Sequence, residues 1–189
     1  MASWQAWKNS VGAALVLGAL VAPVSAQTVS FTTTGSGVQG TTLGLDVRIT
    51  GVVDLYAFQF SLNFNPSVLQ ATAVTEGPFL PTAGGTFFGP GTINNTTGIV
   101  SFAFDSLVGT IPGASGSGIL AHINFATPAA GTSAITFSNV VLLNSALVDI
   151  PFTATGGSVT VSAVPEPAPF LLLAAGLAGL ALRRRLQAA

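Results

Sequence analysis

The sequence predicts an all-β fold: a jelly-roll antiparallel β-sandwich of about nine strands, with an apolar helix at each terminus. Between the two ends, short runs alternate between apolar and polar residues with a period of two, which is the pattern of half-buried strands. Clusters of Gly, Pro, Asn and Thr separate these runs, and no internal segment shows a helical period. Strands that follow one another without intervening helices are typical of sandwiches and jelly rolls.

The alternation is clearest over residues 41–50 and 55–64. In the second run, every second residue from Tyr56 is apolar, and Asn65-Pro66 ends the run because proline cannot donate a hydrogen bond to a neighbouring strand. Further strands are expected at residues 68–74, 86–88, 99–104, 119–125, 134–143 and 158–161. The aromatic residues expected to fill the core are Phe58, Phe60, Phe64, Phe102, Phe104, Phe125 and Phe137.

The composition excludes several classes of function. The chain has no cysteine, which excludes zinc fingers, iron–sulfur clusters, thiol catalysis and disulfide scaffolds. Only 6% of the residues are charged, and four of the five cationic side chains lie near the two termini, which leaves Arg48 within the central region. A nucleic-acid-binding protein needs a dense basic surface, so no nucleic acid is expected as a partner.

Residues 1–26 have the pattern of a secretory signal peptide rather than of a buried helix. Lys8 supplies the positive charge, residues 11–21 form an apolar run, and small residues precede the predicted signal peptidase cleavage between Ala26 and Gln27. The run is too short to cross a membrane as a permanent helix. We therefore expect an exported protein whose folded domain covers residues 27–163.

The last 26 residues, 164–189, form a second terminal segment. Val164-Pro165-Glu166-Pro167 precedes an uncharged apolar helix predicted over residues 168–182, and Arg183, Arg184 and Arg185 follow it. Fifteen helical residues span about 22 Å, against about 30 Å for a hydrocarbon core, and the arginines would stay on the cytoplasmic side. These elements resemble the PEP-CTERM sorting signal of Gram-negative bacteria. The resemblance implies processing by an exosortase while the helix holds the chain in the inner membrane; the alternative is a plain membrane anchor.

The central region resembles the cohesin domain family from Val29 to Val161. The resemblance rests on residues 51–69, an apolar-aromatic strand followed by Asn65-Pro66 and then Val68-Leu69, and on later segments in matching order. It implies a nine-stranded jelly roll similar in fold to carbohydrate-binding modules. Cohesins of cellulosomes bind calcium-loaded dockerin modules through one sheet face. The corresponding strand here offers the following polar side chains: Gln59, Ser61 and Asn63.

The titratable residues do not form a recognisable catalytic or metal-binding set. The one histidine, His122, alternates with Leu120 and Asn124 and is expected to face solvent. Asp105 or Asp149 could contribute an oxygen to a calcium site, but no cluster of ligands is evident. The carboxylates expected to be scattered over turns and outward positions are Asp46, Asp54, Glu76, Asp105 and Asp149. We therefore predict no catalytic residue, metal site or cofactor.

Three phenylalanines in Gly- and Pro-rich segments, Phe79, Phe87 and Phe88, are the candidate binding residues, with core packing as the alternative. The sequence thus predicts an exported, non-catalytic binding or structural protein of the cell surface or extracellular matrix. Its expected partner is an extracellular polysaccharide or a surface protein. The alternative is a dockerin-binding cohesin in an extracellular polysaccharide-degrading assembly.

Overall fold

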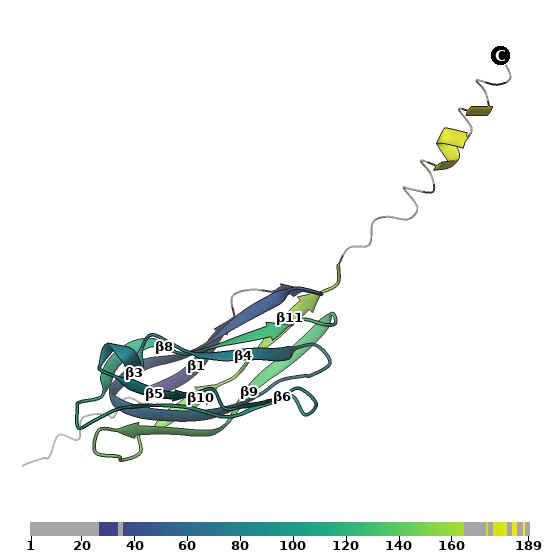
Figure 1. The fold of residues 1–189 in the computed structure, drawn as a ribbon. Coiled ribbons are helices and arrows are strands. Elements are labelled where there is room, and N and C mark those ends of the chain that lie inside the picture. The colour runs from purple at the N-terminus through teal and green to yellow at the C-terminus, as the bar shows by residue number, and fades with distance from the viewer. Residues whose placement is uncertain are drawn as a thin grey trace, which may run out of the picture.

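A computed structural model describes residues 27–33 and 36–164, together with residues 173, 176–180, 183, 184 and 187 of the C-terminal segment. The predicted signal peptide, Pro165-Glu166-Pro167 and Arg185 lie outside the described residues. The described domain is an all-β sandwich, as predicted (Figure 1). Its strands are Gln27–Thr33 (β1), Gly37–Val38 (β2), Thr42–Asn63 (β3), Gln70–Glu76 (β4), Thr86–Gly89 (β5), Thr92–Asn94 (β6), Ile99–Leu107 (β7), Ala114–Ala126 (β8), Gly131–Asn144 (β9), Phe152–Thr155 (β10) and Gly157–Ser162 (β11).

Nine of the eleven strands have four or more residues, and β2 and β6 are shorter. Every strand expected from the sequence is present. The structure adds β1, β2, β6 and β10, and a 3-10 helix, η1, at Leu80–Thr82. Most neighbouring strands are antiparallel, but β1 pairs with β10, and β11 with β2, in parallel.

The two layers share one long strand. The first half of β3 pairs with β1 and β8, and the second half pairs with β7 and β9. We call β4, β8, the first half of β3, β1 and β10 the first sheet. The second sheet contains β5, β6, β7, the second half of β3, β9, β11 and β2.

The sequence predicted two separate strands where the structure has β3. The chain bends between them, because Gly51 and Asp54 have φ angles of 67° and 60° and the pairing with β8 shifts on both sides of Val52. A residue with a positive φ angle turns an extended chain, while the residues around it keep their hydrogen bonds to the neighbouring strands. The bend therefore passes the strand from one sheet to the other.

The side chains between the sheets form a single hydrophobic core. Phe60 and Phe125 are among its largest fully buried members, and Phe64 packs edge-on against Phe125 with ring centres 5.2 Å apart. Phe58 is buried as predicted, and Phe137 is partly buried against the core. Sandwich cores of this kind bury the inward residues of both sheets and leave alternate residues outside.

Two bulges overturn the predicted facing of individual residues. In β8, the pairing with β3 skips Leu120, so Leu120 is buried beside Ala121 instead of lying on the outer face with His122. In β7, Phe102 has a φ of 53° and the pairing with β3 shifts there. Phe102 is therefore exposed rather than in the core, and Phe104 also faces outward. An extra residue on one strand reverses the alternation beyond it, which a strict period of two cannot foresee.

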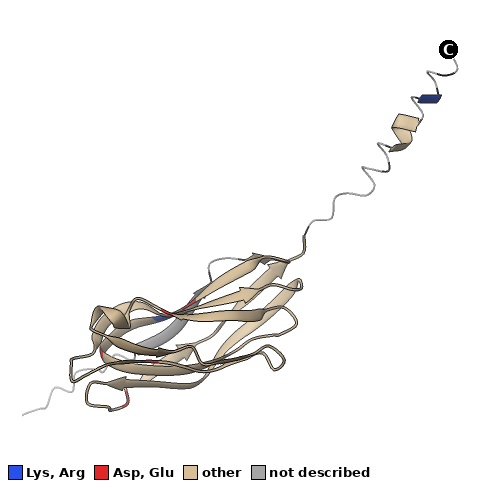
Figure 2. Cartoon of the chain, viewed as in Figure 1, with Lys and Arg blue, Asp and Glu red and all other residues tan. Residues whose placement is uncertain are grey.

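In the C-terminal segment, residues 173, 176–180, 183 and 184 are helical. Among the described residues, none of the helices combines the length and apolar character that crossing a membrane requires. The predicted helix at residues 168–182 lies only partly within this description. Figure 2 shows how few residues of the domain are charged.

Candidate binding face

The outer side of the second sheet presents two rows of side chains in register. Phe87 of β5, Ser106 of β7, Ala57 of β3 and Leu143 of β9 form one row. Gly89, Phe104, Gln59 and Val141 form the next row on the same four strands. Residues paired across strands point to the same side of a sheet, so these rows make one continuous surface. We call it the outer face.

The outer face is hollowed at its centre. A depression of about 220 Å³ lies over the small side chains of Ala57 and Ser106. Larger side chains surround it on the neighbouring strands. The full lining is Ala57, Phe58, Gln59, Phe104, Asp105, Ser106, Val141 and Leu143, of which the Phe58 and Asp105 side chains are buried.

Two exposed aromatic side chains lie near Phe104, one of the residues that line the hollow. Phe87 is 65% exposed and Phe102 54% exposed. The rings of Phe87 and Phe104 are 5.8 Å apart and inclined at 48°. Phe104 lies over Gly89, where a Cβ atom would come within 2.2 Å of its ring. The bulge that exposes Phe102 is fixed by the Phe102 N–H, which donates a 3.1 Å hydrogen bond to Ser61 Oγ.

The three phenylalanines selected from the sequence lie in different environments. Phe87 is exposed on the outer face, and Phe88 points inward and is partly buried against the core. Phe79 is only 7% exposed, and its ring packs where a side chain on Gly118 would otherwise lie. A buried ring cannot stack on a ligand, so the selection of Phe79 is wrong and core packing explains it.

Phe102 and Phe104 were not among the candidate binding residues, because the alternation pattern placed both in the core. No alternation signal could have found them, since the bulge lies at Phe102 itself. Of the polar residues of β3, Gln59 and Asn63 are partly exposed, whereas Ser61 is buried and accepts the hydrogen bond from Phe102.

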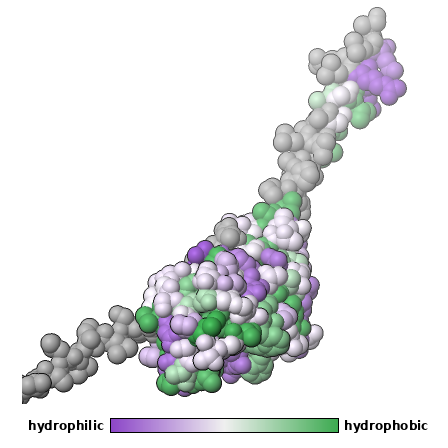
Figure 3. All heavy atoms as spheres, turned by 60° about the vertical axis from the view of Figure 1, so that its left-hand side comes forward, coloured by the Kyte–Doolittle hydropathy of each residue, from purple (hydrophilic) through white to green (hydrophobic). Residues whose placement is uncertain are grey.

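None of the side chains that form the two rows of the outer face is charged. The polar groups among them are the Gln59 amide and the Ser106 hydroxyl. Figure 3 shows one side of the molecule, where apolar atoms gather in patches among weakly polar ones. A surface of this composition recognises its partner by shape and apolar burial rather than by ion pairing.

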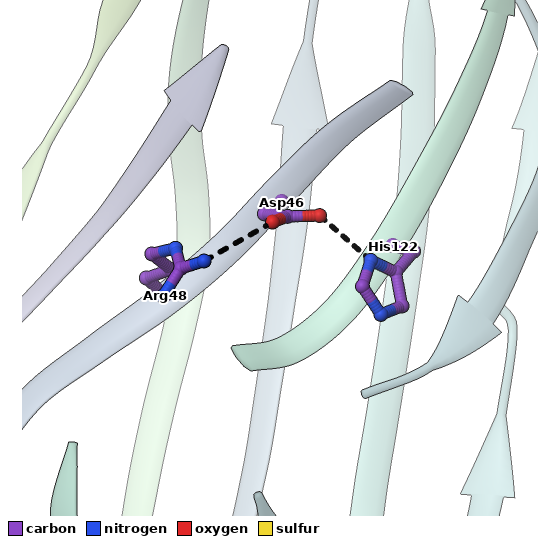
Figure 4. Close-up of polar contacts among 3 residues, drawn as sticks. All are labelled: Asp46, Arg48 and His122. Atoms are coloured by element: carbon purple, nitrogen blue, oxygen red, sulfur yellow. Dashed lines mark hydrogen bonds and ion pairs between the residues drawn. The ribbon is translucent and has the colours of Figure 1, made fainter. Parts of the chain in front are cut away.

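A charged cluster lies instead on the outer side of the first sheet (Figure 4). His122 of β8 is in register with Asp46 of β3, and His122 Nδ1 lies 2.6 Å from Asp46 Oδ1. Arg48 Nη2 donates to Asp46 Oδ2 at 3.4 Å. The His122 side chain is partly exposed, in agreement with its predicted outward position. Within the described part of the chain, no hydroxyl group is hydrogen-bonded to His122, as a hydrolytic triad would require.

Two of the carboxylates predicted to be scattered are in contact. Asp105 is 1% exposed, and it meets Glu76 across the space between the sheets. Burial, the charge of Glu76 and a hydrogen bond with it raise the pKa of Asp105 to about 7. No group of three His, Asp or Glu residues within the described ranges could hold a metal ion.

Comparison with protein-family models assigns the domain. The model of the cohesin domain matches residues 28–161, which include every strand that forms the outer face. The chain belongs to the cohesin family. A second model, of the PEP-CTERM protein-sorting motif, matches residues 163–185. This match includes Val164 through Pro167 and the three arginines, as the sequence predicted, and it implies export through an exosortase system of Gram-negative bacteria. No curated protein sequence matches the chain.

Solved cohesins share the fold. The chain is similar to a type II cohesin from Acetivibrio cellulolyticus, in a structure of a mutant cohesin–X-dockerin complex, with a TM-score of 0.60 and 14% identity over 72% of this chain and 99% of that one. It is also similar to a non-cellulosomal cohesin from the hyperthermophilic archaeon Archaeoglobus fulgidus, with a TM-score of 0.56 and 16% identity over 77% and 96%. A third similar structure is the cohesin module of a Clostridium perfringens family 33 glycoside hydrolase, with a TM-score of 0.60 and 7% identity over 74% of this chain and 98% of that one. At these identities the likeness shows the fold alone.

Proposed function

We propose that this cohesin is a non-catalytic binding module, exported to the cell surface or extracellular matrix, that holds a partner protein on its outer face. The observation that carries the proposal is the hollow of the outer face together with two exposed phenylalanines beside Phe104, which lines it: Phe87 packs against the Phe104 ring, and Phe102 precedes it by two residues on β7. Burial of apolar surface stabilises an association by roughly 25 cal/mol per Å² before the costs of association are subtracted. Exposed aromatic side chains grouped on one face are therefore the main source of binding free energy on this domain.

The shape of the face favours a protein over a polysaccharide. Sugar rings stack on flat aromatic platforms and need several hydrogen-bonding side chains around them. Phe87 and Phe104 are inclined at 48° and do not form a common plane, and few polar side chains border the hollow. Interfaces between proteins have this composition, with aromatic anchors in an apolar centre.

A dockerin module is the first partner class to test. Several solved relatives with this fold are described as complexes of a cohesin with a dockerin. In that case the protein would serve as the receptor in an extracellular assembly, which is the second candidate function. A surface protein without a dockerin and the matrix polysaccharide are the other candidates that the experiment below distinguishes.

The two terminal segments would deliver the domain. Signal peptidase would cleave between Ala26 and Gln27, and the strand β1 begins at Gln27 directly after this point. The C-terminal helix would hold the chain in the inner membrane until an exosortase-type enzyme processes the tail. The match to the sorting motif over residues 163–185 supports this route.

The experiment uses mature protein purified from the extracellular fraction of the producing bacterium. It is added to washed cells that lack the gene, and the bound fraction is measured after sedimentation. We expect F87S and F102S each to reduce binding about tenfold or more, because both remove exposed anchors, and H122Q on the opposite sheet to bind like the wild type. Unchanged binding of both phenylalanine variants would exclude the outer face.

Pretreatment of the cells identifies the partner. Loss of binding after protease treatment supports a protein, and release of the bound protein by EDTA then identifies a calcium-loaded dockerin. Loss of binding only after treatment with a polysaccharide-degrading enzyme would contradict a protein partner and favour the matrix polysaccharide.

A further inference from the structure

A carboxyl pair, of which Asp105 is buried and Glu76 half-buried, lies at the edge where the two sheets meet. Glu76 is the last residue of β4, at the edge of the first sheet, and Asp105 lies in β7 of the second sheet. The Asp105 side chain points into the core, between Phe58 and Phe88, which are its register partners on the two adjacent strands. Two carboxyl groups from different sheets thus meet in an apolar setting.

The hydrogen bonds of this pair are incomplete. Asp105 Oδ1 accepts a 2.9 Å hydrogen bond from the Ser106 N–H, but Oδ2 is buried and has no hydrogen-bond donor. Glu76 Oε1 accepts a 2.5 Å hydrogen bond from the Thr86 hydroxyl. Leaving a buried charged oxygen without a donor costs several kcal/mol in proteins, so such oxygens normally have a partner. A carboxylic acid proton supplies the missing donor when two carboxyl groups are in contact.

Among the described residues, no basic side chain pairs with these two carboxyls. Arg48 and His122 are the basic side chains of the strands that pack against it, and both bind Asp46 on the outer side of the first sheet. Asp54 binds Gly113 and Ser145 in the loops, and Tyr56 donates to the carbonyl of Gly109. Together with Asp105, the residues just named are all the titratable residues of β3, β7 and β8 in the described ranges, and β5 and η1 contain none.

We propose that Asp105 and Glu76 share one proton at mildly acidic pH, and that this shared proton holds β4 of the first sheet to β5 and β7 of the second. Two carboxylates in contact cannot both be ionised without strong repulsion, so one proton is retained on the pair. Burial of Asp105 and, after it, the charge of Glu76 raise the pKa of Asp105 to about 7.

The contact between Asp105 and Glu76 also positions the outer face. Thr86 binds Glu76 on the inner side of β5, and the next residue, Phe87, points to the outer side. Phe104 directly precedes Asp105 in β7, and its ring packs against Phe87 on the outer face. Loss of the shared proton would therefore loosen the edge strand that carries an exposed anchor. This consequence for binding rests on the proposed function, whereas the shared proton does not.

The test follows the carboxyl carbons of the full mature protein by ¹³C NMR while the pH rises from 3 to 9. We expect the Asp105 carboxyl to titrate with a midpoint near 7, D105N to abolish that step, and E76Q to lower its midpoint, because the neighbouring charge is removed while burial remains. Titration of Asp105 below pH 5 in the wild type would overturn the proposal, whatever the partner of the outer face.

Thermal unfolding gives an independent readout. A carboxyl whose pKa is higher in the folded than in the unfolded state stabilises the fold at low pH, and that stabilisation is lost as pH rises toward the folded value. The melting temperature of the wild type should therefore fall between pH 4.5 and 7 relative to D105N, in which an amide replaces the proton donor. The melting temperature of D149N, which removes an exposed carboxylate, should fall with pH in parallel with that of the wild type. A D105N protein that folds and shows the full wild-type decline would contradict the shared proton.

Discussion

The ring of Phe104 lies over Gly89 in the neighbouring strand, where any side chain would occupy the space of the ring. This contact at the edge of the second sheet keeps Phe104 beside Phe87 on the outer face. A glycine in an edge strand that is covered by an aromatic ring from the next strand is a recognised way to protect such an edge.

Replacement of Gly89 by alanine should displace the Phe104 ring. We expect G89A to lower the free energy of unfolding by roughly 1–3 kcal/mol, as overpacking does, and to weaken partner binding. Chemical denaturation and the cell-binding assay measure the two effects. G85A is the matched control, because a Cβ on Gly85 meets no atom within 4 Å. Equal stability of G89A and G85A would contradict the packing of Phe104 on Gly89.

Asp54, at the bend of β3, joins two loops at one end of the sandwich. Its Oδ1 accepts a 2.6 Å hydrogen bond from the Gly113 N–H, and its Oδ2 accepts hydrogen bonds from the N–H and the hydroxyl of Ser145. We expect D54N to lower the free energy of unfolding by about 1–2 kcal/mol at pH 7, because an amide NH₂ cannot accept from Ser145. S145A, which removes the hydroxyl alone, should cost less.

The effect of D54N should also depend on pH. The Ser145 hydroxyl, with the Gly113 N–H, holds the pKa of Asp54 below its ordinary value of 3.8. A lowered pKa in the folded state contributes stability above 3.8 that is lost as pH falls through the folded value. The difference between the wild type and D54N in urea denaturation should therefore shrink below pH 3.8. A difference that grows on acidification would show that the Asp54 contacts are absent in solution.

The Asp46–His122 pair should contribute little to stability or binding. The pair lies on a partly exposed surface of the first sheet, where ion pairs stabilise proteins by about 0–1 kcal/mol. We expect the free energies of unfolding of D46N and H122Q, measured by chemical denaturation, to differ from that of the wild type by no more than this amount. Both variants should bind cells normally. Loss of cell binding in both variants would place a binding surface on the first sheet.

The tail should be removed after export. The intact mass of the extracellular protein should correspond to a chain that starts at Gln27 and lacks the segment beyond Pro165-Glu166-Pro167. Replacement of Arg183, Arg184 and Arg185 by glutamine should leave the tail attached and the protein in the membrane fraction. A full-length extracellular species from the wild type would contradict processing at both ends.

The sequence predicts the fold well where alternation is regular. Residues 41–50 and 55–64 showed which side chains form the core of β3, and the turn at Asn65-Pro66 was placed correctly. The parallel strand β10 was not predicted, because four residues after Pro151 carry too short a pattern.

The binding face was predicted only in part, for local physical reasons. Phe87 was selected because it lies in a Gly-rich segment, but the bulge at Phe102 reversed the alternation of β7. The same reversal sent Asp105 inward to Glu76, a contact between residues 29 positions apart that no local pattern encodes. Irregularities in single strands thus determine both the exposed anchors and the burial of Asp105 beside Glu76.

The most direct measurement of where the partner binds is photo-crosslinking on living cells, with p-benzoyl-L-phenylalanine in place of Phe102 on the outer face or of Thr75 on the exposed side of β4. We expect a discrete crosslinked protein from position 102 and none from position 75. The same crosslinked product from position 75, with none from position 102, would contradict binding through the outer face.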